Sequence, residues 1–117
     1  MGINTIHLKG IKLKTLLGIR KKERRNKQYI CISCVIQYKL FGELKENIKN
    51  TVNYKNILKL IKTFIKNSSF FLIETLAFEL SQFLIKHLRL KYILLKIEKL
   101  EVLKNIEKVG VIIERNI

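Results

Sequence analysis

Two long stretches near the start of the chain alternate between apolar residues and charged or polar ones. Over residues 3–17 the alternation slips in parity at Gly10. A period of two predicts a strand with one buried face, and a slip at a glycine predicts a β-bulge. Residues 29–41 alternate without a slip and predict a second strand. Its apolar face would carry Ile30, Ile32, Cys34, Ile36, Tyr38 and Leu40.

The middle of the chain changes to helical spacing. Over 54–66 apolar residues recur every three or four positions and lysines occupy the other side, which predicts an amphipathic helix. Asn53 is placed to cap its start. Residues 67–69 break the pattern, and a second helix is predicted over about 72–88. Its buried face would carry Ile73, Leu76, Ala77, Leu80, Leu84 and Leu88.

One carboxylate, Glu74, falls in the first turn of this second helix. The positive end of the helix dipole stabilises a negative charge there, so Glu74 has a purely structural explanation. A carboxylate at that place is also suited to anchoring a ligand that carries N–H donors. The residues of the helix alone leave both explanations open.

Residues 91–99 and 109–115 alternate again and predict two further strands. Lys99 closes the apolar row of the first of these strands, which is unusual. Either its ammonium reaches out to water, or it is held partly desolvated, where its pKa can be tuned. The order strand, strand, helix, helix, strand, strand predicts an α+β fold. In it, a four-stranded antiparallel sheet carries two helices on one face.

The predicted sheet leaves apolar surface uncovered. The sides of the strands that face away from the helices carry Val35, Leu94 and Ile112. With 117 residues, 48% of them hydrophobic, the chain supports one domain with one modest core, residues 1–117. Because free sheet edges promote association, we expect assembly through those edges into a ring.

The net charge of +15 raises the question of a nucleic-acid partner. The basic residues are spread over the whole chain, and the 19 lysines far outnumber the 5 arginines. Isoleucine is as abundant as lysine, whereas Asp, Pro and Trp are absent. The excess of isoleucine, lysine and asparagine is typical of an AT-rich genome. We therefore do not expect nucleic acid as a partner. The charge should act mainly on solubility and on anionic substrates.

The sequence also allows predictions on the location of the protein and on redox and metal sites. No apolar run approaches the roughly 18–20 residues that span a membrane, and the start of the chain has no signal-peptide pattern, so a cytoplasmic protein is expected. Cys31 and Cys34 form a Cys-x-x-Cys, but within a strand their side chains point to opposite faces. We therefore expect neither a redox pair nor a metal site at these cysteines.

Five segments, in this order and spacing, resemble the dihydroneopterin aldolase family of folate biosynthesis, which includes the dihydroneopterin triphosphate 2'-epimerases. The resemblance covers nearly the whole chain. The segments are Gly18-Ile-Arg-Lys-Lys-Glu23 with Gln28 downstream, Thr51-Val-Asn-Tyr54, Leu72-Ile-Glu-Thr-Leu-Ala77, Ile97-Glu-Lys99 and Val109-Gly-Val-Ile-Ile-Glu-Arg115.

The resemblance implies a ββααββ tunnelling fold, ring tetramers that usually stack into a homo-octamer, and a pterin site between neighbouring subunits. Glu74 matches the family's pterin-binding glutamate, and Leu72 and Ile73 lie where the backbone contacts the pterin. Three residues match catalytic positions of the family. These are Lys99 for acid–base catalysis, Tyr54 supplied across the subunit interface, and Glu23 in a loop near the site.

Those residue types suit the family's retro-aldol reaction. A base must take the 2'-hydroxyl proton and an acid must protonate the resulting enamine. A lysine with a lowered pKa can do both, directly or through a water. The pterin ring accepts the electrons, so neither Schiff base nor metal is needed, and the resemblance implies that no cofactor takes part. Re-addition of the cleaved fragment to its other face gives 2'-epimerisation.

The choice between the two activities rests on local detail. Residues 18–28 are more similar to the epimerases, whereas residues 72–77 and 109–115 are more similar to the aldolases. The family usually has Pro after its catalytic lysine, and here Leu100 follows Lys99. A lyase, 7,8-dihydroneopterin aldolase, is the primary prediction, with the triphosphate 2'-epimerase (an isomerase) as the alternative.

Overall fold

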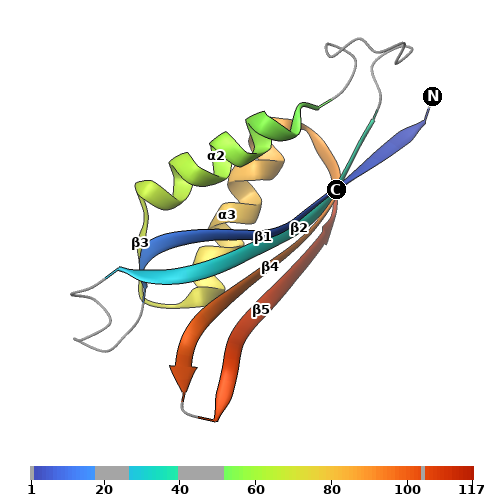
Figure 1. Ribbon diagram of the computed structural model, residues 1–117. Helices are drawn as coiled ribbons and strands as arrows, with labels where there is room; N and C mark the ends of the chain where they lie inside the picture. The colour runs from blue at the N-terminus through green and yellow to red at the C-terminus, as the bar shows by residue number, and fades with distance from the viewer. Residues whose placement is uncertain (1, 18–26, 40–51, 104) are drawn as a thin grey trace.

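The strands and helices follow the predicted order along the chain (Figure 1). The computed structural model describes residues 2–17, 27–39, 52–103 and 105–117. Within these residues the elements are β1 (Ile3–Leu17), β2 (Gln28–Lys39), α2 (Tyr54–Lys66), β3 (Ser69–Phe70), α3 (Ile73–Leu88), β4 (Leu90–Leu103) and β5 (Ile106–Asn116).

The sheet formed by the described residues has five strands, in the order β3-β1-β2-β4-β5. The four long strands pair antiparallel, as predicted, whereas β3 pairs parallel with β1 through Leu16–Ser69 and Leu17–Phe70. The prediction of a four-stranded, purely antiparallel sheet was therefore wrong. A two-residue strand is too short to show alternation, and β3 forms only because the link between the helices passes the end of β1.

The predicted bulge in β1 is confirmed at Gly10. Leu8 pairs with Cys34 and Ile11 with Ile32, so β1 has one more residue than β2 in this interval. Gly10 has φ +72°, in the left-handed region that glycine enters at no steric cost. The extra residue restores the parity, so that Leu8 and Ile11 both face the helices.

Helices α2 and α3 lie on one face of the sheet, and the core lies between these two layers (Figure 1). Helix α2 buries Ile57, Ile61 and Ile65, which are spaced one turn apart and lie on one stripe. Helix α3 buries Ile73, Leu76, Ala77, Leu80, Ser81 and Leu84. Against them lie the inward rows of the sheet, including Ile32 and Ile36 of β2 and Ile93 of β4, all fully buried.

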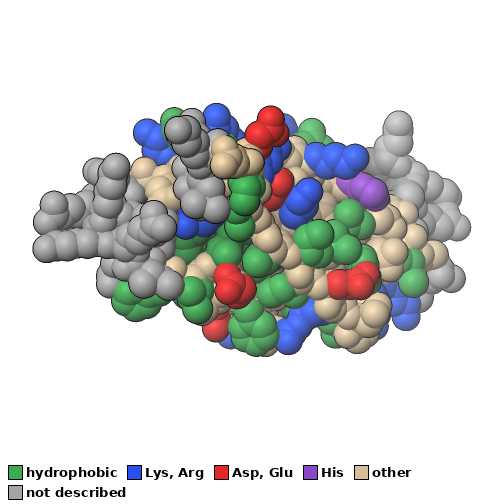
Figure 2. Space-filling model, turned by 90° about the horizontal axis from the view of Figure 1, so that it is seen from below, with side chains coloured by type: hydrophobic (Ala, Val, Ile, Leu, Met, Phe, Trp, Pro, Cys, Tyr) green, Lys and Arg blue, Asp and Glu red, His purple; other side chains and the backbone are tan. Residues whose placement is uncertain are grey.

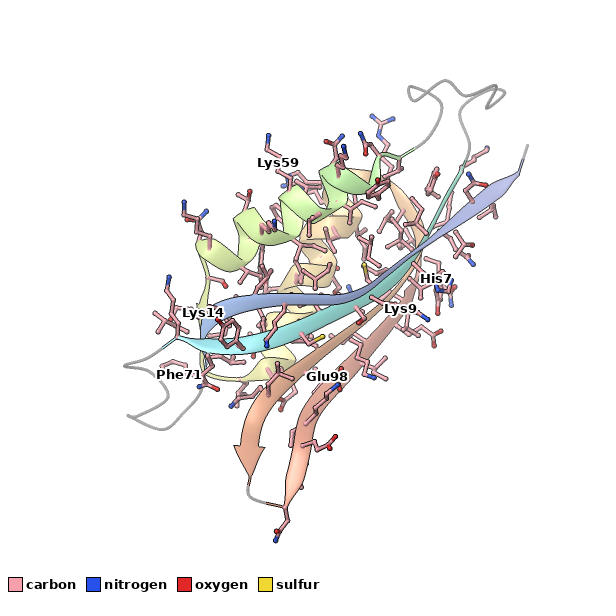
Figure 3. All side chains as sticks on the ribbon, in the orientation of Figure 1. His7, Lys9, Lys14, Lys59, Phe71 and Glu98 are labelled. Carbon is pink, nitrogen blue, oxygen red and sulfur yellow. The ribbon has the colours of Figure 1, made fainter. Side chains whose placement is uncertain are left out.

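The other face of the sheet is covered by neither α2 nor α3. Lys9, Lys14 and Glu98 lie on this side in Figure 3, whereas Lys59 points outward from α2. Ile112 is 60% exposed here, and apolar side chains run between separate charged groups on the surface seen in Figure 2. The uncovered apolar face expected from the sequence is thus present, and β5 is an edge strand of the sheet that the described residues form.

Cys31 and Cys34 lie on opposite faces of β2, as predicted. Cys34 is buried among core residues, whereas Cys31 is half-buried on the uncovered face, and both are free thiols. Burial raises the pKa of the Cys34 thiol from 9.0 to about 11, because an apolar environment disfavours the thiolate. In the described part of the chain, no helix is both long and apolar enough to span a membrane.

Candidate active site

Lys99 lies where the pairing of β2 with β4 ends, on the face that carries the helices, and β4 itself continues to Leu103. Lys99 pairs with Ile30 of β2 and with Val109 of β5. It continues the buried row of β4, which consists of Ile93, Leu95 and Ile97. Its side chain is half-buried and in contact with other groups. Lys99 therefore lies where the apolar core meets the solvent, as the alternation of the strand predicted.

Helix α3 begins at the same end of the sheet. Strand β3, which directly precedes it, pairs with the last residues of β1, while β4 returns from the far end of α3 to reach Lys99. Glu74 lies in the first turn of α3 and is exposed to solvent. The topology therefore brings the predicted anchor and the predicted acid–base group to one end of the molecule.

The first turn of α3 lacks the side-chain cap that α2 has. In α2 the Asn53 side chain accepts a hydrogen bond from the backbone N–H of Lys55, at 3.0 Å. In α3 the N-cap is Leu72, whose side chain cannot accept such a bond. The first N–H groups of a helix have no partner within the helix. The start of α3 thus combines backbone donors with the Glu74 carboxylate, a set that suits a ligand with both acceptors and N–H donors.

Leu72 and Ile73 differ in how they support this helix start. Leu72 is 41% exposed and has an extended backbone conformation, whereas Ile73 is 8% exposed and packs into the core. The buried Ile73 side chain fixes the position of the first turn. Glu74 follows Ile73 in the same turn, so its backbone position is fixed by this packing.

Tyr54 is not brought together with Glu74 and Lys99 within one chain. It is the first residue of α2, and the last residues of α2 lead into β3 at the Glu74 end. A helix of 13 residues is about 20 Å long. Tyr54 therefore lies towards the opposite end of the sheet, and it is 58% exposed. A site that contains all three side chains needs Tyr54 from a second copy.

Glu23, the remaining predicted site residue, lies outside the described residues. So do the rest of the segment 18–26, Leu40 of the predicted second strand, and Thr51, the first residue of the Thr51–Tyr54 motif. The predictions made for them therefore stay predictions. No group of three or more His, Cys, Asp or Glu side chains that could hold a metal ion is found among the residues that the structure describes.

Two further polar residues lie at the Lys99 end of the sheet, on the helix-facing side. Thr15 of β1 pairs with Gln28 of β2. Two residues away along each strand, Ile30 of β2 pairs with Leu13 on one side and with Lys99 on the other. The Gln28 side chain donates a hydrogen bond from Nε2 to the carbonyl oxygen of Leu17, at 2.6 Å. Gln28 belongs to one of the segments that resemble the family, whereas Thr15 was not predicted from the sequence to be a site residue. A threonine that interrupts the apolar row of β1 was the available signal.

Comparison with known proteins identifies the kind of protein that has these features. The family model described as FolB, dihydroneopterin aldolase, matches residues 6–114. The dihydroneopterin triphosphate 2'-epimerase of Escherichia coli (strain K12) is 29% identical over 106 residues, which cover 90% of this chain and 88% of that protein.

Two solved structures have the same fold at low sequence identity. The E. coli dihydroneopterin aldolase in complex with neopterin has a TM-score of 0.90 and 19% identity, covering 97% of this chain and 99% of the other. The dihydroneopterin aldolase of Burkholderia thailandensis, bound to guanine, has a TM-score of 0.83 and 16% identity, covering 97% and 91%. At these identities the likeness concerns the fold alone.

Proposed function

Because this chain belongs to the dihydroneopterin aldolase family, we propose that it acts on a dihydroneopterin side chain by retro-aldol chemistry. The primary candidate is 7,8-dihydroneopterin aldolase, which forms 6-hydroxymethyl-7,8-dihydropterin and glycolaldehyde. The observation that carries the proposal is that Glu74 and Lys99 lie at the same end of the sheet.

Glu74 is the proposed anchor for the pterin. The amino-pyrimidinone edge of a pterin presents neighbouring N–H donors, and one carboxylate can accept from two of them in a bidentate, charge-assisted contact. Neopterin and guanine, the ligands of two solved relatives, share this edge. The uncapped start of α3, with Leu72 exposed, adds backbone donors that suit the ring's acceptor atoms.

Lys99 is the proposed acid–base group. As a base it takes the proton of the 2'-hydroxyl, and the bond between C1' and C2' breaks as the 2'-oxygen becomes a carbonyl. The electron pair passes into the dihydropterin ring system to give an enamine. Return of a proton to C1' then releases 6-hydroxymethyl-7,8-dihydropterin. Lys99 is half-buried and lies where the buried row of β4 ends, a position that suits an amine which must reach the substrate from a packed strand.

Tyr54 and the ring assembly belong to the same proposal. Because Tyr54 lies far from Lys99 in its own chain, we assign it to the site of a neighbouring subunit. The edge strand β5 and the exposed Ile112 favour association of this kind. Glu23 is proposed as a further group near the reacting atoms, on the resemblance alone.

The triphosphate 2'-epimerase is supported equally well. The E. coli relative is named for that activity, and it covers nine-tenths of the chain. Epimerisation uses the same bond cleavage, followed by re-addition of the fragment to its other face before release.

Incubation of the purified protein with 7,8-dihydroneopterin and, separately, with its triphosphate tests the proposal. Chromatography of the products distinguishes the two activities. An aldolase yields 6-hydroxymethyl-7,8-dihydropterin and glycolaldehyde as the main products. An epimerase yields the 2'-epimer, mainly from the triphosphate. Absence of turnover with both substrates would contradict the proposed function.

A further inference from the structure

Three polar side chains interrupt or end the apolar rows on the helix-facing side of the sheet, and they do so at one end. They are Thr15 on β1, Gln28 on β2 and Lys99 on β4. Neighbouring strands lie about 4.8 Å apart, and residues two apart along a strand about 6.7 Å. On this spacing the Lys99 and Gln28 side chains can meet across a diagonal, and Thr15 lies directly opposite Gln28.

Thr15 is the most buried of the three. It is 2% exposed, and its Oγ1 has no hydrogen-bond partner among the residues that the structure describes. By contrast, the buried Ser81 of α3 donates its hydroxyl proton to the carbonyl oxygen of Phe78 at 2.7 Å. A buried hydroxyl without a partner destabilises a fold, whereas valine has the same shape without this cost.

We propose that Thr15 is a positioning residue for the reaction, a role that rests on the proposed function. Its hydroxyl and the Gln28 carboxamide hold one ordered water. This water accepts a hydrogen bond from the Lys99 ammonium and so fixes the position of the Lys99 side chain beside the substrate. An internal water needs two to four polar partners, and these three side chains supply them. Gln28 is itself held by its bond to the Leu17 carbonyl, so the water has a fixed partner.

The variants Thr15→Val and Thr15→Ser distinguish the effect of the Thr15 hydroxyl on catalysis from the effect of the side chain's shape on packing. The valine keeps the shape and removes the hydroxyl, so we expect kcat to fall about tenfold and KM to change less than about twofold, because Glu74 still binds the pterin. We expect its midpoint of urea unfolding to be unchanged or higher. The serine keeps the hydroxyl and should retain most of the wild-type kcat.

Thr5→Val is the matched control. Thr5 lies at the far end of the same strand, opposite Gln37 as Thr15 lies opposite Gln28, but it is exposed. Its loss should leave kcat and KM unchanged. If Thr15→Val is poorly folded, the pair Thr15→Ser and Thr15→Ala makes the same comparison, since the two differ only in the hydroxyl.

The inference is overturned if Thr15→Val keeps the wild-type kcat, or if the serine and alanine variants lose kcat equally. The second result would mean that the methyl group matters through packing. Absence of turnover in the wild-type protein is a different result. It would remove the proposed function and this inference with it.

Discussion

Lys96 and Lys99 lie three residues apart on β4, and their surroundings differ because they lie on opposite faces of the sheet. Lys96 is on the uncovered face, with its Nζ 3.8 Å from a carboxylate oxygen of Glu98. Lys99 is on the helix-facing side, at the end of the buried row. Lys99 is therefore the candidate for catalysis, and Lys96 is its control on the same strand.

Lys99→Ala should lower kcat by about a thousandfold, because proton transfer by a positioned side chain contributes on that order. Affinity for neopterin should persist, since binding is assigned to Glu74. Steady-state kinetics and a pterin titration on the same preparation measure both. Lys96→Ala should leave both values near wild type. Equal losses of kcat in the two variants would mean that Lys99 has no special role.

Cys34 provides a prediction on pH that is independent of catalysis. Burial raises the pKa of its thiol from 9.0 to about 11, so between these values the unfolded chain loses the proton while the folded chain keeps it. This contribution to stability is complete below pH 9 and is lost as the pH rises towards 11.

Urea unfolding of the wild type and of Cys34→Ala at about pH 8 and about pH 11 measures that contribution. Other groups titrate in both proteins, so only the difference between the two is informative. We expect the stability advantage of the wild type to shrink by roughly 2 kcal/mol over this range. An advantage that is the same at both pH values would show that the thiol does not resist ionisation.

The places of single residues could be predicted from the sequence where a residue disturbed a regular pattern. Lys99 ended an apolar row and Gly10 shifted a parity, and both effects are local and visible in the sequence. Thr15 was missed because threonine is a normal residue of strands. Thr15 becomes a candidate only when the strand register is known, because the register places it opposite Gln28.

At the scale of elements, the two helices start in different ways. Helix α2 is capped by Asn53, and it carries lysines on its outer face with no acidic residue in its first turn. Helix α3 begins at Leu72 without a side-chain cap and has Glu74 in its first turn. A side-chain cap stabilises the start of α2, whereas no side chain caps the backbone N–H groups at the start of α3.

Asn53→Ala should destabilise the protein by about 1 kcal/mol, because it removes the acceptor for the Lys55 N–H. Thermal or urea unfolding measures the loss. Asn56→Ala, at an exposed position in the first turn of the same helix, is the control and should have little effect. Equal stability of the two variants would mean that the cap contributes nothing.

The boundaries of both helices and the long strands could be predicted to within a few residues, because the periodic patterns are long. Strand β3 could not, because Ser69 and Phe70 pair with β1 only through the tertiary arrangement. The same reason explains the extension of β4 beyond Lys99 and of β5 before Val109, where the two strands pair as a hairpin.

In the molecule as a whole, Tyr54 and Lys99 lie towards opposite ends of the sheet. The sequence alone could not reveal this distance, because the direction of α2 along the sheet follows from the pairing of β3. The edge strand β5 and the uncovered face with Ile112 are the surfaces that a second copy would cover. The proposed site is therefore complete only in an assembly.

Mixing two inactive variants tests this assembly. If Tyr54 acts across an interface, subunits of Tyr54→Ala and Lys99→Ala that are refolded together form some sites with both residues intact. In a closed ring with random order, about one site in four is of this kind. Activity should therefore rise well above that of either variant alone. A mixture no more active than the mean of its parts would assign both residues to one chain's own site.

Whether the start of α3 holds a pterin through Glu74 can be tested by a binding measurement. Neopterin is titrated into the wild type, Glu74→Gln and Glu79→Gln, with pterin fluorescence as the signal; Glu79 is exposed on the same helix. We predict that the wild type and Glu79→Gln bind alike, and that Glu74→Gln binds about ten- to a hundredfold more weakly, because it loses a charge-assisted contact. No binding by the wild type, or equal binding by the two variants, would mean that Glu74 is not a pterin anchor.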